Sequence, residues 1–173
     1  AEALLSRGCC DHRVLFVGGE GGLEADLVPR HGHDLELLKV GKLKGSAWSV
    51  RARTLAGLPL AVGAAARILR RFRPHVVVGV GGYASAPVVM AASLLRLPVI
   101  LLEQNAVPGI TNRVLSRFAR LVVTTFQHAQ GYFPSGKAVL LGNPIRDEVA
   151  LPLLARDGAE KKAARGEPPC LLV

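Results

Sequence analysis

Short apolar runs alternate with glycine-rich turns and amphipathic stretches along this chain. Runs rich in valine, leucine and isoleucine predict strands at residues 13–17, 34–40, 75–80, 99–102, 121–124 and 138–141. Helical periodicity predicts helices at residues 23–28, 50–72, 86–95, 110–118 and 126–132. Strands that alternate with helices form parallel sheets, because each parallel connection needs a crossover. We therefore expect an α/β fold, with a Rossmann-like parallel sheet flanked by helices.

The most informative apolar run lies at residues 76–80 and leads directly into a glycine loop. Its three consecutive valines, at residues 76–78, predict a short strand buried on both faces of the sheet. Gly81 and Gly82 then let the backbone turn sharply and approach a ligand closely. Ser85 is the expected N-cap of the next helix, with Pro87 in its first turn. Together these features suit a phosphate site, although they also suit a tight turn with no ligand.

Three polar residues, Glu103, Gln104 and Asn105, follow the apolar run at residues 99–102. In open parallel sheets, ligands bind at the carboxyl ends of the strands. Glu103 would there either orient a ligand or act as a general base, and we favour the orienting role. The sequence thus predicts a second part of the same site at this edge.

The net charge narrows the class of partner. The chain carries 22 lysines and arginines against 13 acidic residues, which gives a formal charge of +9. This surplus suits a nucleic acid, a phosphorylated substrate or a lipid surface. Aromatic residues make up only 5% of the chain, and no zinc-finger or helix-turn-helix spacing occurs, so we do not expect nucleic acid.

The long helix predicted at residues 50–72 combines apolar side chains with many arginines. One interpretation is a helix that covers the sheet and turns a basic face to solvent. The other is a patch that rests on an anionic membrane surface, where apolar and basic side chains act together. The residues of this candidate docking patch are Trp48, Arg51, Arg53, Leu55 and Leu58.

Cysteines and histidines give no sign of a metal site or a disulfide framework. Cys9, Cys10 and Cys170 are odd in number and lack CxxC spacing, and His31 and His33 have no third ligand near them in the sequence. We expect no metal, no cofactor and a reducing compartment. No apolar run approaches the about 20 residues that a transmembrane helix needs, so we expect a protein that is soluble or lies on a membrane.

The composition of the chain changes after residue 150. Residues 151–169 combine prolines, a glycine and alternating charges, as a linker does, and residues 170–173 look like the first strand of a further unit. Residues 1–6 look like the end of a helix, whereas an α/β domain ordinarily begins with a strand. We therefore expect residues 1–150 to be one domain without its first strand, in a chain truncated at both ends.

Four motifs resemble one known family. In chain order they are EADLVP at residues 24–29, GVGGY at 79–83, EQN at 103–105 and GNPIR at 142–146. Their order and spacing are similar to those of the MurG family, which are bacterial N-acetylglucosaminyltransferases of the two-domain GT-B type (glycosyltransferase family 28). The resemblance covers about residues 1–150 and implies the acceptor-binding N-terminal half of a GT-B fold. Residues 170–173 would then begin the donor domain.

The resemblance implies a specific reaction in peptidoglycan biosynthesis. N-acetylglucosamine passes from UDP-GlcNAc to undecaprenyl-pyrophosphoryl-MurNAc-pentapeptide (lipid I), giving lipid II with inversion at the anomeric carbon and without a metal. Such transferases are peripheral proteins on the cytoplasmic face of the inner membrane. The resemblance therefore favours the membrane-docking interpretation of the helix at residues 50–72, and it gives no indication of an oligomeric state.

The resemblance also implies roles for individual residues. Gly81, Gly82, Tyr83 and Gln104 would bind the acceptor diphosphate and sugar, while Asn105 and Arg146 would bind the UDP-GlcNAc donor. Glu103 is the catalytic candidate in this chain, because the family's usual histidine would precede Ala1 and Leu102 stands where many members carry another histidine. Without the first glycine loop and the donor domain, this stretch alone is not expected to turn over.

Two other classes of protein share some of these features. A Rossmann oxidoreductase needs a GxGxxG loop after its first strand and an acidic residue about 20 positions later. The glycine loops at residues 18–22 and 79–82 lack that spacing. The nearest alternative is a non-catalytic module that binds a nucleotide sugar or a phosphate.

Overall fold

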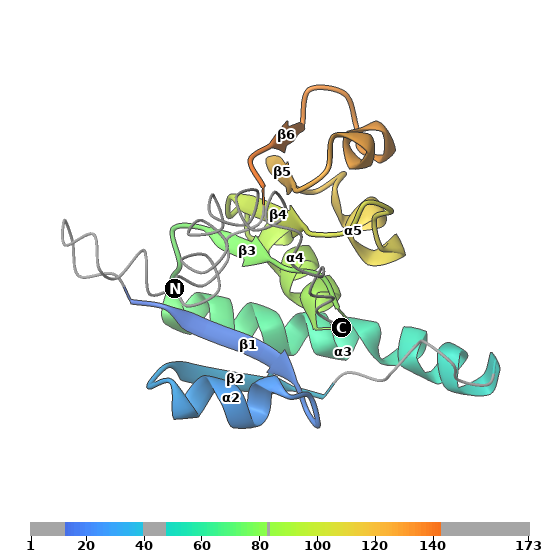
Figure 1. Ribbon diagram of the computed structural model, residues 1–173. Coiled ribbons are helices and arrows are strands. Elements are labelled where there is room, and N and C mark those ends of the chain that lie inside the picture. The colour runs from blue at the N-terminus through green and yellow to red at the C-terminus, as the bar shows by residue number, and fades with distance from the viewer. Residues whose placement is uncertain (1–12, 40–47, 83, 143–173) are drawn as a thin grey trace, which may run out of the picture. The chain divides into compact units, whose positions relative to one another are not determined.

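The computed structural model describes residues 13–39, 48–82 and 84–142, with the side chains of the long helix described from residue 57 onward. The strands are β1 (Leu15–Gly19), β2 (Asp34–Leu38), β3 (Val77–Gly79), β4 (Val99–Glu103), β5 (Leu121–Thr124) and β6 (Ala138–Leu140). The helices are α2 (Glu24–Arg30), α3 (Trp48–Phe72), α4 (Ser85–Leu94), α5 (Ile110–Leu115) and the 3₁₀ helix η1 (Gln127–Tyr132). Strands and helices alternate along the chain, as predicted (Figure 1).

All strand pairs in the described residues are parallel, which confirms the α/β prediction. β1 pairs with β2 in one sheet, and β3, β4, β5 and β6 follow one another in a second sheet. The strands therefore form two sheets rather than one, and β1 and β3 each have an edge without a partner strand in this part of the chain.

The core lies mainly between the four-stranded sheet and α4. Val99 and Leu101 of β4 are almost fully buried, as are Val122 of β5 and Val89 of α4. Leu38 at the end of β2 belongs to the same apolar cluster. Alternate positions of β4 are buried, so close packing in the core fixes the position of its carboxyl end.

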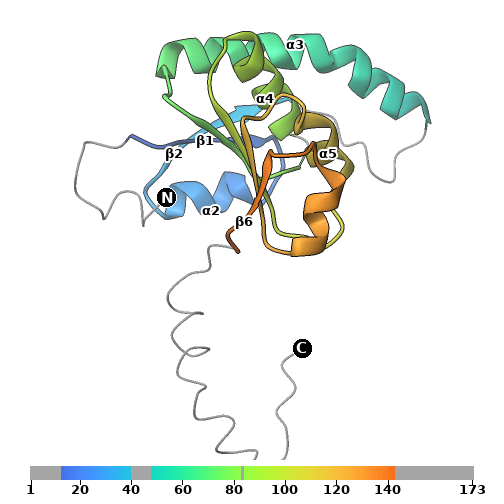
Figure 2. The ribbon, with the colours of Figure 1, turned by 90° about the horizontal axis from the view of Figure 1, so that it is seen from above.

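The helices lie on both sides of the β1–β2 pair. α2 packs on β1 and β2, and α3 contacts β2 and runs along α4. Figure 2 shows α2 and α3 on opposite sides of this pair. Ala61, Ala65 and Leu69 form the buried side of α3. Within the described residues, no helix is long and apolar enough to span a bilayer.

Three local predictions were wrong. The run at residues 76–80 is not buried on both faces, because Val76, Val78 and Val80 are 44%, 50% and 60% exposed while Val77 is buried. These three valines share the face opposite to the buried Val77, and β3 is paired only with β4 among the strands that the structure describes, so few neighbours cover them. Ser85 is not the N-cap of α4: Ala84 takes that place, and Ser85 Oγ instead donates to the carbonyl of Gly81.

The third wrong prediction concerns the helix expected at residues 23–28, which instead extends to Arg30, with Pro29 in its last turn. Gly32 N donates to the carbonyl of Pro29, so the helix closes just after the proline. α5 is also shorter than predicted and ends at Leu115. The predicted linker at residues 151–169 and the strand at 170–173 lie outside the described residues.

Candidate functional site

The glycine loop after β3 has two glycines that its backbone geometry requires. Gly81 and Gly82 have φ angles of 91° and 82°, which side chains strongly disfavour. Gly79, at the end of β3, is needed for packing, since a Cβ there would lie 2.7 Å from Leu101 Cδ2 and 3.2 Å from Val89 Cγ2. The core therefore fixes the start of the loop, and the two later glycines set its turn.

The loop presents backbone donors next to the N-terminus of α4. Ser85 Oγ donates to the carbonyl of Gly81 over 2.5 Å, which holds that peptide in place. In the described residues, the N–H groups of Gly81 and Gly82 donate to no acceptor. Free N–H groups beside a helix N-terminus attract an anion, because the partial charges of both have the same positive sign.

The carboxylate of Glu103 lies at the end of β4 and is only 2% exposed. Its Oε1 accepts hydrogen bonds from Asn105 N (3.0 Å) and Asn105 Nδ2 (2.8 Å). Its Oε2 accepts from Gly109 N (3.2 Å) and Asn112 Nδ2 (3.0 Å). Four N–H donors can stabilise a buried carboxylate without a cation. Glu103 thereby fixes the whole turn from residue 105 to residue 109.

Asn112 of α5 connects this turn to the glycine loop, and the sequence did not single it out. Its side chain is 4% exposed, and Nδ2 donates both to Glu103 and to the carbonyl of Leu102 (3.0 Å). A Cβ placed on Gly81 would lie 3.6 Å from Asn112 Nδ2 and 3.8 Å from Oδ1. The glycine loop and the Glu103 turn are therefore neighbours on one edge of the sheet. The sequence did carry one signal for Asn112: it is a polar residue in the first turn of the helix that follows the loop after β4.

The remaining predicted residues of this edge have distinct surroundings. Asn105 is exposed, and its amide nitrogen is engaged by Glu103, so its Oδ1 points away from that contact. Gln104 is half-buried and makes no side-chain hydrogen bond in the part that the structure describes. Tyr83 and Arg146 lie outside the described residues. Gly81, Gly82, Glu103 and Asn105 are thus brought to one place.

The other glycine-rich segment, at residues 18–22, is filled by a side chain of the same chain. Glu24 Oε1 accepts a hydrogen bond from Gly19 N (3.3 Å). The Glu24 side chain also covers the positions where side chains on Gly18 and Gly22 would project. A carboxylate of the same chain already lies in this loop and accepts from Gly19 N, so an external anion is not favoured there.

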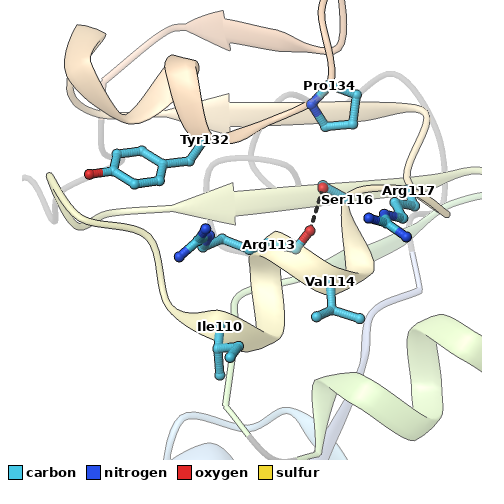
Figure 3. Close-up of a pocket in the computed structure, with 7 residues that line it drawn as sticks. All are labelled: Ile110, Arg113, Val114, Ser116, Arg117, Tyr132 and Pro134. Atoms are coloured by element: carbon cyan, nitrogen blue, oxygen red, sulfur yellow. Dashed lines mark hydrogen bonds between the residues drawn. The ribbon is translucent and has the colours of Figure 1, made fainter.

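A separate hollow of about 450 Å³ lies between α5 and the segment around Tyr132. Its lining residues are Ile110, Arg113, Val114, Ser116, Arg117, Tyr132 and Pro134 (Figure 3). The Arg113 guanidinium lies 5.2 Å from the centre of the Tyr132 ring. None of the site residues predicted from the sequence lines this hollow. Two of its lining residues, Arg113 and Arg117, are basic.

The candidate docking patch is described only in part. Trp48, Arg51, Arg53 and Leu55 belong to α3, but their side chains lie outside the described part of the structure. Leu58 is half-buried, and Leu60, which the candidate patch did not include, is 79% exposed. In the described residues, no group of three His, Cys, Asp or Glu side chains could hold a metal ion.

Comparison with known proteins gives consistent matches. The family model for the glycosyltransferase family 28 N-terminal domain matches residues 2–124. Two curated relatives are UDP-N-acetylglucosamine--N-acetylmuramyl-(pentapeptide) pyrophosphoryl-undecaprenol N-acetylglucosamine transferases. The one from Myxococcus xanthus is 51% identical over 84% of this chain, and the one from Magnetococcus marinus is 50% identical over 80%. This chain covers 38% of either relative.

Solved structures agree with the fold. The crystal structure of Acinetobacter baumannii MurG is 30% identical and aligns with a TM-score of 0.66 over 84% of this chain and 40% of that chain. A UDP-GlcNAc 2-epimerase from Neisseria meningitidis, 13% identical with a TM-score of 0.50, shares the fold over 88% of this chain and 52% of its own. The chain therefore spans about two fifths of the length of its curated relatives.

Proposed function

Because this chain belongs to glycosyltransferase family 28, we propose that it forms the acceptor side of an enzyme that makes lipid II. The reaction would move N-acetylglucosamine from UDP-GlcNAc to lipid I, with inversion at the anomeric carbon. The observation that carries the proposal is the grouping of the glycine loop, Glu103 and Asn105 around Asn112 at one sheet edge. The names of the 51% and 50% identical relatives support the choice of substrates.

The glycine loop suits the diphosphate of lipid I. The N–H groups of Gly81 and Gly82, which have no acceptor among the described residues, and the N-terminus of α4 offer donors without a competing carboxylate. Glu103 is the only acidic residue between residues 37 and 142, and its carboxylate is buried and engaged. Tyr83 follows Gly82 and Gln104 follows Glu103 in the sequence, and we propose both as further contacts to the acceptor.

Glu103 acts in this proposal by orientation rather than as the base. A general base must have a carboxylate oxygen that can reach a proton of the substrate. Both oxygens of Glu103 are instead engaged, by three N–H groups of the turn and one of Asn112. Through this turn it directs Asn105, whose Oδ1 has no partner among the described residues and can accept a hydrogen bond from a hydroxyl of the donor sugar. Arg146 is proposed to face the UDP phosphates, where a guanidinium stabilises the charge on the leaving group.

The chemical step is a single displacement. The muramoyl C4 oxygen forms a bond to the anomeric carbon while the bond from that carbon to the UDP oxygen breaks, and the proton of the hydroxyl passes to a base. UDP leaves with the bonding electrons, so its phosphates gain negative charge. The residues of this chain bind and align the acceptor for this step, which lowers the entropic part of the barrier.

Transfer by the full-length protein tests this proposal. Radiolabelled UDP-GlcNAc and a lipid I analogue should give a labelled lipid product, and Asn105→Ala should lower the rate. Binding of UDP-GlcNAc without transfer by the full-length protein would support the alternative, a non-catalytic nucleotide-sugar module. Absence of both would contradict any role with this nucleotide sugar.

We further propose that α3 rests on the cytoplasmic face of the inner membrane as a peripheral contact. Support comes from the exposed Leu60 on a helix that also carries Arg67 and Arg70 at its exposed side, and from the sequence of Trp48, Arg51, Arg53, Leu55 and Leu58. Basic and apolar groups on one helix bind anionic lipid together.

Vesicle co-sedimentation tests the membrane proposal separately from transfer. Full-length protein should pellet with vesicles that contain phosphatidylglycerol at low salt and much less with pure phosphatidylcholine. Leu60→Ser and a double Arg51→Glu, Arg53→Glu variant should each reduce binding. Equal binding by all variants would show that another surface makes the contact.

A further inference from the structure

Asn112 carries a buried polar atom that has no partner. In the part of the chain that the structure describes, its Oδ1 is the one buried side-chain oxygen or nitrogen without a hydrogen bond. Native proteins satisfy nearly all such atoms, so an exception calls for a physical explanation. An apolar side chain of similar size would avoid this unpaired oxygen, but it would leave the two acceptors of Nδ2 without a donor.

The orientation of this amide is determined by its two acceptors. Nδ2 donates to the carbonyl of Leu102 and to Glu103 Oε2, both at 3.0 Å. Turning the amide over would place Oδ1 against two oxygens, which repel it. The nitrogen therefore faces the end of β4, and Oδ1 is left beside the glycine loop.

The same amide lies beneath the glycine loop. Its nitrogen, oxygen and carbon are the three atoms nearest to the space where a Cβ of Gly81 would be, at 3.6, 3.8 and 3.9 Å. Gly81 therefore lies next to this amide. One side chain thus hydrogen-bonds the carboxylate that fixes Asn105 and lies beside the proposed anion loop.

We propose that Asn112 is a positioning residue that couples the glycine loop to the Glu103 turn. Its amide nitrogen holds the carboxylate of Glu103, and the same amide group supports the neighbouring glycine loop at Gly81. The unpaired oxygen is the consequence of this arrangement, because the nitrogen is needed at β4. The predicted effects on lipid I binding rest on the proposed function, whereas the coupling between the two loops does not.

Two variants of the full-length protein test the coupling. Asn112→Ala removes the amide, and Asn112→Leu removes it while keeping most of the volume, in case the alanine variant does not fold. Either variant should raise KM for a lipid I analogue by about 10-fold or more, because small displacements of a binding loop are costly to the reaction. Hydrogen exchange without substrate should also become faster in peptides that span residues 79–85 and 103–109.

The matched control is Ser116→Ala. Ser116 is buried at the end of the same helix, and its hydroxyl donates to the carbonyl of Arg113, away from both loops. This variant tests loss of a buried polar group from α5 without loss of the coupling. It should leave KM for the lipid I analogue and exchange in the two loops as in the wild type.

A double-variant cycle with Glu103→Gln gives the decisive outcome. If Asn112 acts through Glu103, the combination of Asn112→Ala with Glu103→Gln should be little worse than the worse single variant. Additive effects, or faster exchange confined to α5, would overturn the proposal. Absence of transfer by the wild type would contradict the proposed function alone, because the exchange measurements would still decide the role of Asn112.

Discussion

The described residues contain two strand–glycine loop–helix units, β1–α2 and β3–α4, which differ in whether a carboxylate of the same chain covers the loop. In the first, Glu24 reaches back over the loop and accepts a hydrogen bond from Gly19 N. In the second, Gly81 and Gly82 have no such cover, and their N–H groups have no acceptor in the described residues. A glycine loop at a helix start is thus not enough to predict a phosphate site. What matters is whether a side chain of the same protein already accepts hydrogen bonds from the N–H groups of the loop.

The distribution of charge reinforces this difference. Residues 13–36 contain five acidic and two basic residues, whereas residues 37–142 contain 14 lysines and arginines and one acid, Glu103. The lone acid is buried and bound by four N–H groups. The second unit therefore lies in a part of the chain that attracts anions, and the first does not.

The largest predicted effect is a difference in stability between variants of the two carboxylates, Glu103 and Glu24. Glu103→Gln replaces a charged acceptor with a group that is half donor, so two N–H groups lose their partner in a buried place. We expect the free energy of unfolding to fall by roughly 2–3 kcal/mol, in line with the cost of unsatisfied buried groups. Glu24→Gln, at a half-buried surface position, should change it by less than about 0.5 kcal/mol.

Urea unfolding of the full-length protein, followed by circular dichroism, measures both values. If the domains unfold separately, the transition of the N-terminal domain is the one to compare. Equal losses for the two variants would contradict the structural role assigned to Glu103.

A second comparison uses the two glycines at the strand ends. Gly79→Ala would place a methyl group against Leu101 and Val89 in the core, and we expect a loss of roughly 1–3 kcal/mol from overpacking. Gly18→Ala would meet only the Glu24 side chain, which can rotate away at a smaller cost. Thermal unfolding of both variants gives the difference, and a larger loss for Gly18→Ala would contradict the packing argument.

The sequence predicted the elements well, because each depends on local pattern. β5 matched its predicted range, and α3 and α4 began within two residues of theirs. The exposure of Val76 and Val78 was missed, since valines alone do not reveal whether a strand lies at an edge. Asn112 was missed for a similar reason: its importance comes from contacts with residues 81 and 103, which the sequence does not bring together.

The resemblance also succeeded and fell short in an instructive way. It identified the edge that carries Gly81, Glu103 and Asn105, and the family assignment is confirmed. It did not reveal that Glu103 is enclosed by four donors, nor that Glu24 closes the first glycine loop. Both depend on side-chain geometry around a turn, which a motif does not specify.

A third comparison isolates binding from stability. Gly82 and Gly21 both have positive φ angles, 82° and 78°, and no neighbouring atom lies within 4 Å of the place that a Cβ would take on either. An alanine at either should cost a similar amount of stability, about 1–2 kcal/mol, from backbone strain. Only Gly82→Ala should also weaken binding of a lipid I analogue, by about 10-fold, because it alters the loop whose N–H groups we propose as the anion donors.

Steady-state kinetics of the full-length variants, with KM for the lipid I analogue and for UDP-GlcNAc measured separately, test this pair. The stability of each variant serves as the internal control. A tenfold increase in KM for Gly21→Ala as well would mean that strain spreads through the domain, and the distinction between the two loops would fail.

The smallest predicted effect is a gain of binding in the closed loop. Glu24→Gln removes the negative charge that covers Gly18 and Gly22 but keeps a side chain of the same size. We expect inorganic pyrophosphate to bind this variant a few-fold more tightly than the wild type, because the negative charge beside Gly19 no longer repels the anion. Isothermal titration calorimetry at low salt can measure the change, and a Gly82→Ala background removes the contribution of the open loop. If the gain disappears in that background, the added affinity comes from the long-range charge of the domain. A gain that persists there would locate the new site at residues 18–22 and confirm that Glu24 alone keeps this loop closed.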